Sequence, residues 1–103
     1  MYKLSFFVPE DFLEQTKDAV FAAGGGQIGN YDCCAWQTLG QGQFRPGEGS
    51  QPFLGKKDQI ERVAEYKVEL VCQEDRIRAV VDALRAAHPF EEPAYEVYRI
   101  ETF

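Results

Sequence analysis

Residues 2–26, YKLSFFVPEDFLEQTKDAVFAAGGG, are repeated in altered form at residues 66–90, YKVELVCQEDRIRAVVDALRAAHPF. The two stretches align without a gap, and eight of the 25 aligned pairs are identical. Two copies separated by so long a period are not typical of a solenoid, in which many shorter repeats stack on one another. We therefore predict two related supersecondary units that share one hydrophobic core.

Each copy begins as a strand and continues as a helix. Residues 2–8 and 66–72 alternate between apolar and polar side chains, which is the period of a half-buried strand. The spacing of apolar residues then lengthens to that of one helix face. The positions on this face are Phe12, Thr16, Ala19, Val20 and Ala23 in the first copy and Ile77, Val80, Val81 and Leu84 in the second.

Two further strands complete the predicted fold, at residues 31–39 and 95–100. The order strand, helix, strand, strand, helix, strand is that of the ferredoxin-like α+β fold, a βαββαβ sandwich with a four-stranded antiparallel sheet. Right-handed crossovers place both helices on one face of the sheet. The opposite face is expected to carry Phe7, Trp36, Val71 and Tyr98, and association of identical subunits is the simplest way to cover them.

Glycines 24, 26 and 29 match the spacing G-x-G-x-x-G of a phosphate-binding loop. That loop opens a helix, so that main-chain N–H groups point at the phosphate. Here the glycines follow a helix, and we interpret them as a helix-to-strand connection.

The composition limits the classes of partner. The 103 residues contain 11 Lys and Arg against 17 Asp and Glu, a formal net charge of −6 at pH 7. The cationic residues are scattered, so we expect neither nucleic acid nor a membrane as partner. Three cysteines (Cys33, Cys34 and Cys72) without C-x-x-C spacing do not indicate a disulfide framework, and we expect a cytoplasmic location.

A glycine-rich stretch at residues 40–57, GQGQFRPGEGSQPFLGKK, is the first candidate site. We expect it to form a long loop between the second and third strands, and such loops are often functional. Its candidate ligand-binding residues are Gln43, Phe44, Arg45 and Glu48. Arg45 is suited to grip a carboxylate or phosphate in bidentate fashion, or to pair with Glu48 or with a neighbouring subunit.

The turn HPFEEP at residues 88–93 is the second candidate site. His88 and Glu92 are candidate ligand-binding residues, and His88 with Glu91 could hold a divalent metal such as copper or zinc. The alternative interpretation is a helix C-cap with solvated glutamates. One histidine is too few for the usual ligand set of a hydrolytic zinc site.

Residues 29–55 and 86–98 resemble the insert domain of bacterial Nif-three-like dinuclear-metal proteins. The resemblance implies a ferredoxin-like fold similar to PII signal proteins and CutA, whose C-terminal segment the 88–93 turn also resembles. In the family the insert separates two halves that carry the metal ligands. The chain resembles a stand-alone insert, without the histidine-rich metal core, so the family's hydrolase annotation, sometimes written as a GTP cyclohydrolase homologue, is not carried over.

These inferences predict a single domain, residues 1–103, that is oligomeric (a trimer or a dimer), non-catalytic, and small-molecule-binding or regulatory. The site is expected at a subunit cleft between residues 40–57 and the 88–93 turn, with Arg45 anchoring an anion. The alternative is a CutA-like divalent metal-binding protein that uses His88 and nearby carboxylates. A weaker third hypothesis is an adaptor that docks on another protein through its sheet.

Overall fold

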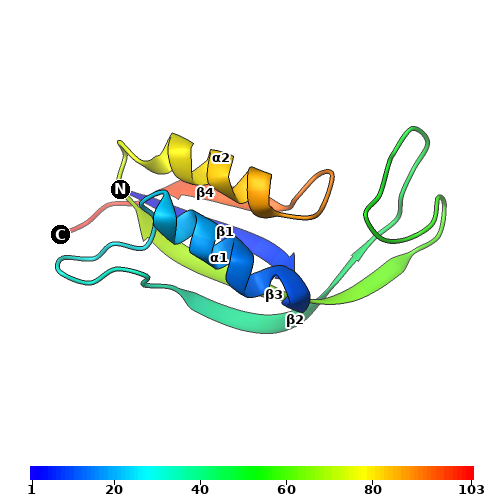
Figure 1. The fold of residues 1–103 in the computed structure, drawn as a ribbon, viewed down its shortest axis with the longest axis horizontal. Helices are drawn as coiled ribbons and strands as arrows, with labels where there is room; N and C mark the ends of the chain where they lie inside the picture. The colour runs from blue at the N-terminus through cyan, green and yellow to red at the C-terminus, as the bar shows by residue number, and fades with distance from the viewer.

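A computed structural model describes residues 1–103 as two helices on one face of a four-stranded antiparallel sheet (Figure 1). The elements are β1 (Tyr2–Pro9), the 3-10 turn η1 (Glu10–Phe12), α1 (Leu13–Ala22), β2 (Trp36–Phe44), β3 (Glu61–Cys72), α2 (Ile77–Ala87) and β4 (Tyr95–Arg99). The strand order across the sheet is β2-β3-β1-β4. The ferredoxin-like fold predicted from the sequence is confirmed.

The two copies of the repeat lie side by side at the centre of the sheet. β1 and β3 pair antiparallel from Tyr2 opposite Cys72 to Pro9 opposite Glu65. Aligned residues of the two copies are buried alike, because each copy presents the same positions to the shared core. The aligned buried pairs are Leu4 and Val68, Phe6 and Leu70, Val8 and Cys72, Thr16 and Val80, and Val20 and Leu84.

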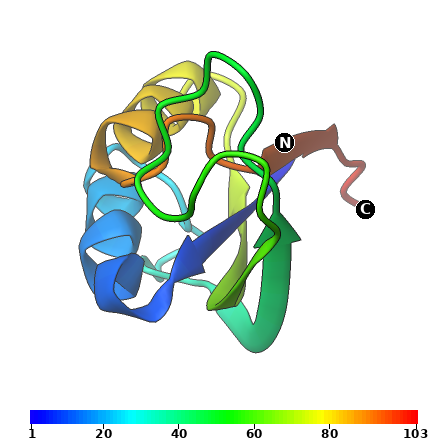
Figure 2. The same cartoon turned by 90° about the vertical axis from the view of Figure 1, so that its right-hand side faces the viewer.

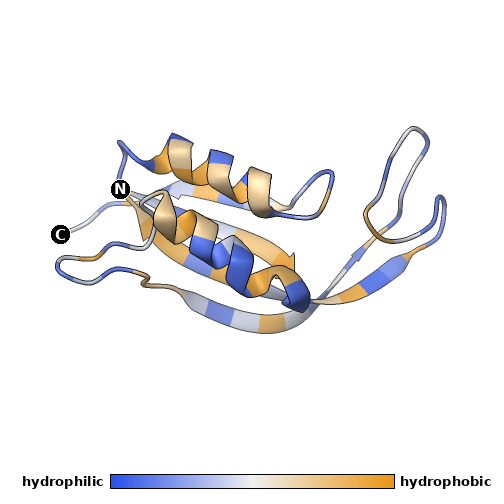
Figure 3. Cartoon of the chain, in the orientation of Figure 1, coloured by the Kyte–Doolittle hydropathy of each residue, from blue (hydrophilic) through white to orange (hydrophobic).

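The hydrophobic core fills the space between the sheet and the two helices. Figure 3 shows apolar positions on the helix surfaces that face the sheet. Phe6, at the centre of β1, is fully buried among them. Thr16 is the one polar side chain of this layer on α1, and its Oγ1 has no hydrogen-bond partner.

The opposite face of the sheet has no covering layer (Figure 2). The strand register places Trp36 opposite Glu69 and Tyr98 opposite Lys3, on the face that also carries Phe7. Trp36 and Tyr98 are 61% and 50% exposed. The sequence assignment of these aromatic residues to the face away from the helices is therefore correct.

The second strand differs from its predicted range of residues 31–39. β2 begins at Trp36 and runs through Phe44, so Gly40–Phe44, predicted as loop, is strand paired with β3. Gly40 and Gly42 weaken a strand pattern in sequence, but ladder hydrogen bonds need only the main chain. Residues 27–35 form a bend in which Ile28 bridges to Tyr31 and Cys33 has a φ of 55°.

The glycines after α1 form a helix-to-strand connection, as expected. α1 ends at Ala22, and the N–H of Gly25 donates to the carbonyl oxygen of Val20. Gly26 has a φ of 77°, and its N–H donates to the carbonyl oxygen of Val71 on β3. These donors bond to protein carbonyls, so the glycines do not offer a phosphate-binding loop.

β2 and β3 extend beyond the other strands as a hairpin arm, and the molecule measures 46 × 24 × 23 Å (Figure 1). The arm loop, residues 45–60, lies across the end of the sandwich near the turn after α2 (Figure 2). The Gln51 N–H donates to Glu91 Oε1 of that turn over 3.0 Å. The arm loop is therefore held against the 88–94 turn, two segments that the sequence separates by about forty residues.

Candidate ligand-binding site

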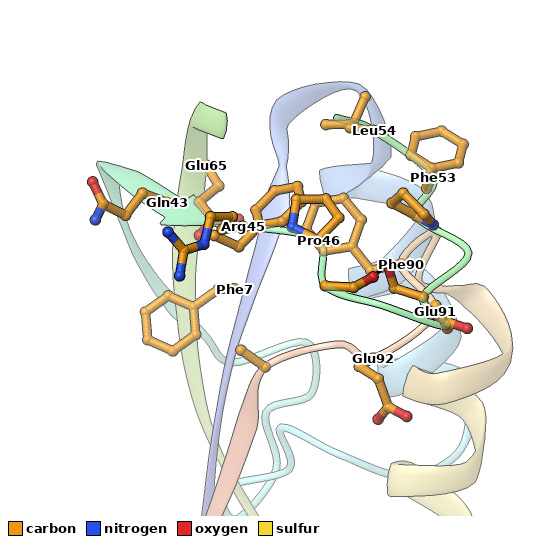
Figure 4. A pocket seen from close by; sticks show the side chains of 15 residues that line it. Phe7, Gln43, Arg45, Pro46, Phe53, Leu54, Glu65, Phe90, Glu91 and Glu92 are labelled. Atoms are coloured by element: carbon orange, nitrogen blue, oxygen red, sulfur yellow. Dashed lines mark hydrogen bonds between the residues drawn. The ribbon is translucent and has the colours of Figure 1, made fainter. Parts of the chain in front are cut away.

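A pocket of about 310 Å³ lies where the arm loop meets the 88–94 turn (Figure 4). Its apolar wall includes Phe44 at the end of β2, Phe53 in the arm loop and Phe90 in the turn. Phe7, from the last part of β1, reaches it from the uncovered face of the sheet. The pocket is thus assembled from three stretches that are distant in the sequence.

Aromatic contacts hold the wall together. The ring centroids of Phe44 and Phe90 are 5.9 Å apart, and those of Phe53 and Phe90 are 6.3 Å apart. Phe53 also packs edge to face against Phe12, the last residue of η1, with ring centroids 5.4 Å apart. Aromatic pairs at such distances each add about 0.5–1.5 kcal/mol beyond their burial. Phe90 therefore links the arm loop to the body of the protein.

His88 lies beneath this wall and is only 6% exposed. The Phe90 N–H donates to Nδ1 over 3.1 Å, so Nδ1 carries no proton. Nε2 therefore carries it and donates to the Phe7 carbonyl oxygen over 2.6 Å. Burial lowers the pKa of His88, against the opposing effect of that hydrogen bond. The imidazole is neutral and orients the Phe90 main chain, with its ring centroid 5.0 Å from that of Phe90.

Four of the six predicted ligand-binding residues line the pocket: Gln43, Phe44, Arg45 and Glu92. Arg45 is exposed and makes no ion pair or side-chain hydrogen bond. Glu48 lies outside the pocket and pairs with Lys57 at 2.6 Å, so its pairing with Arg45 is not observed. His88 supports the wall without lining the pocket.

Glu65 is a pocket residue that the sequence analysis missed. It is half-buried, and no hydrogen bond or ion pair of its carboxylate is present. The carboxylate lies over Gly42, where a Cβ atom would overlap Glu65 Oε1. Burial raises the pKa of Glu65. It lies just before the second repeat copy, and no motif in the sequence singles it out.

The structure does not bring three or more His, Cys, Asp or Glu side chains together in a metal-binding arrangement. Both ring nitrogens of His88 bond to the main chain, and Glu91 accepts from Gln51. A metal ion at His88 and Glu91 would have to replace one of these hydrogen bonds. That metal site stays an untested prediction.

Comparison with known proteins shows similarity to part of several longer proteins. No family model matches it. A GTP cyclohydrolase 1 type 2 homolog of Halalkalibacterium halodurans is 44% identical over 98 residues, which are 95% of this chain and 26% of that protein. The crystal structure of a Bacillus cereus protein related to NIF3 superposes with a TM-score of 0.84 at 38% identity, over 98% of this chain and 26% of that one. The chain is thus similar to one segment of these longer NIF3-related proteins. The chain spans about a quarter of the length of these relatives.

More distant structures share the fold of this chain. CutA from Archaeoglobus fulgidus, a periplasmic divalent cation tolerance protein, has a TM-score of 0.68 at 14% identity, covering 100% of this chain and 87% of that one. GlnK from Bacillus subtilis has a TM-score of 0.61 at 13% identity, covering 96% and 83%. At such identities the similarity establishes a fold of the CutA and PII type and nothing about ligands. Neither α1 nor α2 has the length and apolar character that crossing a membrane requires.

Proposed function

We propose that this Nif-three-like insert domain is a non-catalytic module that binds a small organic molecule in the pocket between the arm loop and the 88–94 turn. The observation that carries the proposal is the pocket itself. It has an aromatic wall, and the Arg45 guanidinium at its edge has no protein partner. Small-molecule sites are typically concave, largely apolar and about 300–1,000 Å³ in volume, with a few polar groups that orient the ligand.

Binding at this place would be transmitted through the fold. The pocket wall joins the arm loop to the turn through Phe53 and Phe90, and to β1 through Phe7. A ligand that contacts all three would hold the arm in one position relative to the sheet. We propose a regulatory role on this basis, because the arm lies at one end of the molecule, where another protein could contact it (Figure 1).

A non-catalytic role is supported by the state of the one histidine. Both His88 nitrogens are bonded to main-chain groups, so the imidazole is not free to accept a proton from a substrate. The relatives named GTP cyclohydrolase 1 type 2 homolog are about four times as long, and an activity of the whole protein is not assigned to this segment.

Association of identical subunits, as a trimer or a dimer, is the second part of the proposal. The uncovered sheet face exposes Trp36 and Tyr98 beside half-buried Phe7 and Val71, an arrangement suited to burial against another copy. Because Phe7 also lines the pocket, this contact would close one side of the site. The proposed location is the cytoplasm, which the three free thiols support.

A thermal-shift screen of nucleotides, amino acids and organic acids tests the proposal. ATP belongs in the panel because a GlnK of this fold, 12% identical, was crystallised with it. A binding molecule is expected to raise the melting temperature of the parent protein and to lose this effect in Arg45→Ala. Arg78→Ala, an exposed arginine of α2 outside the pocket, is the matched control. A screen without any shift, or a shift that Arg45→Ala retains in full, would contradict the proposed site.

A further inference from the structure

The charges around the pocket do not suit a purely anionic ligand. Its lining contains the carboxylates of Glu65, Glu91 and Glu92 but a single cation, Arg45. Like charges repel each other, and more strongly where side chains displace water. A phosphate or dicarboxylate would gain one guanidinium contact and face an excess of negative charge. The ligand must therefore offer positive charge or N–H donors as well as an anionic group.

Glu65 is the pocket carboxylate that is half-buried and lacks a protein partner. Glu91 accepts the Gln51 N–H, and both Glu91 and Glu92 are exposed to solvent. Glu65 makes no hydrogen bond or ion pair, although it is half-buried and burial raises its pKa. Partial burial of the carboxylate without an ion pair disfavours its charged form, which is the direction of its pKa shift, and a cationic partner would offset this cost.

The main chain beneath Glu65 is shaped to hold it there. The absence of a side chain at Gly42 leaves the space that the Glu65 carboxylate occupies. Figure 4 shows Glu65 at the end of the pocket where Arg45, Gln43 and Phe7 lie, away from Phe53 and Glu91. An acceptor and a donor group are thus present at one end of an aromatic-walled pocket.

We infer that the pocket takes an amphoteric aromatic molecule, one that carries an amine and a carboxylate on an aromatic body. The ammonium group donates to Glu65, the carboxylate accepts from Arg45, and the ring packs on the phenylalanines of the wall. This inference rests on the proposed function and specifies its ligand class. A ligand of this class makes a charge-assisted hydrogen bond with each of its two charged groups, whereas an aromatic acid or an aromatic amine makes only one.

Three probes of similar size separate the possibilities. L-phenylalanine carries both charged groups, 3-phenylpropanoate lacks the ammonium group, and phenethylamine lacks the carboxylate. Isothermal titration of the full chain is expected to give the tightest binding for phenylalanine. Each probe that lacks one charged group should bind roughly tenfold or more weakly, because one charge-assisted contact is lost.

Two pairs of variants test the role of Glu65. Gly42→Ala moves the carboxylate but keeps its charge, and should weaken phenylalanine binding roughly tenfold. Gly40→Ala is its control, because a Cβ atom there meets nothing within 4 Å and Gly40 lies on the same strand. Glu65→Gln should weaken phenylalanine and phenethylamine but not 3-phenylpropanoate. Its melting temperature should be no lower than that of the parent, which separates lost binding from lost folding.

The outcomes distinguish this inference from the proposed function. Equal affinity for phenylalanine and 3-phenylpropanoate, unchanged in Glu65→Gln, would overturn the ligand class and leave the pocket assignment in place. The same conclusion applies if the screen yields a purely anionic ligand whose binding is lost in Arg45→Ala and unchanged in Gly42→Ala. If no molecule of the screen binds, the proposed function fails and the inference fails with it.

Discussion

Nε2 of His88 donates a hydrogen bond of 2.6 Å to the carbonyl oxygen of Phe7, which joins the end of α2 to β1 across the edge of the core. Nδ1 of the same ring accepts the Phe90 N–H. Only a neutral imidazole makes both bonds, because a protonated ring has no acceptor. The attachment of the turn to the sheet therefore depends on the protonation state of His88.

Acidification should reduce stability through His88. Burial lowers the pKa of the folded imidazole below its ordinary value of 6.5, so the unfolded chain takes up the proton first. The stabilising effect is complete above pH 6.5 and is lost as the pH falls from there through the lower pKa of the folded state. Urea unfolding at pH 7.5, 6.5 and 5.5 should show this decline. The His88→Asn variant should be less stable than the parent at pH 7.5, and its free energy of unfolding should change little between pH 7.5 and 5.5. If that free energy falls with pH as steeply in the variant as in the parent, His88 is not the group responsible.

Thr16→Val should stabilise the protein. Thr16 is fully buried on α1, its hydroxyl has no partner, and its equivalent in the second repeat copy is Val80. Removing an unsatisfied buried hydroxyl at constant shape should raise the free energy of unfolding by about 1 kcal/mol. Chemical denaturation checks this, with Thr38→Val on the exposed part of β2 as control. A loss of stability in Thr16→Val would mean that the hydroxyl is bonded in solution.

Gly26→Ala should destabilise the protein more than Gly29→Ala. Both glycines have positive φ, 77° and 57°, which costs another residue about 1–2 kcal/mol. At Gly26 an added Cβ would also lie 2.8 Å from the Cys34 carbonyl oxygen, whereas at Gly29 it meets nothing within 4 Å. The difference between the two melting temperatures isolates the steric contact. If both variants lose the same amount of melting temperature, the main chain around residues 26 and 34 can shift to accommodate the added Cβ atom without cost.

Trp36→Glu should convert the proposed oligomer to monomer. The indole lies on the uncovered sheet face, and a carboxylate there would have to be buried unpaired in the contact between subunits. Multi-angle light scattering gives the mass directly. Leu39→Glu is the matched control, because Leu39 is 58% exposed on the same strand but on the face toward the helices. A monomeric parent protein would exclude the oligomer before any variant is made.

The fold was predictable because its signals are local. Apolar residues alternate over β1 and β3 and recur at helical spacing over α1 and α2. Both patterns follow from the local backbone geometry and can be seen in residues that are close in sequence. The second strand was misplaced for the same reason. Gly40 and Gly42 carry no side-chain pattern, and their strand conformation comes from pairing with β3 rather than from their own sequence.

The candidate site was predictable only in part. Arg45 and Phe44 were found because a glycine-rich loop with charged and aromatic residues is conspicuous in sequence. Glu65 was missed because its role depends on the space over Gly42 and on the arm loop beyond it. The pairing of Glu48 with Lys57 likewise depends on how the arm loop closes, which the sequence pattern does not report.

The sequence alone determined the duplicated strand-helix unit, the ferredoxin-like order of elements, and the face of the sheet left bare, because hydrophobic periodicity is written residue by residue. The tertiary structure decided which residues meet at the pocket. It also engages both ring nitrogens of His88 in hydrogen bonds to the main chain, so this side chain is not free to bind a ligand. Those contacts join segments far apart in the chain. Their geometry depends on how the whole sheet, the arm and the turn pack together, and no single stretch of sequence contains it.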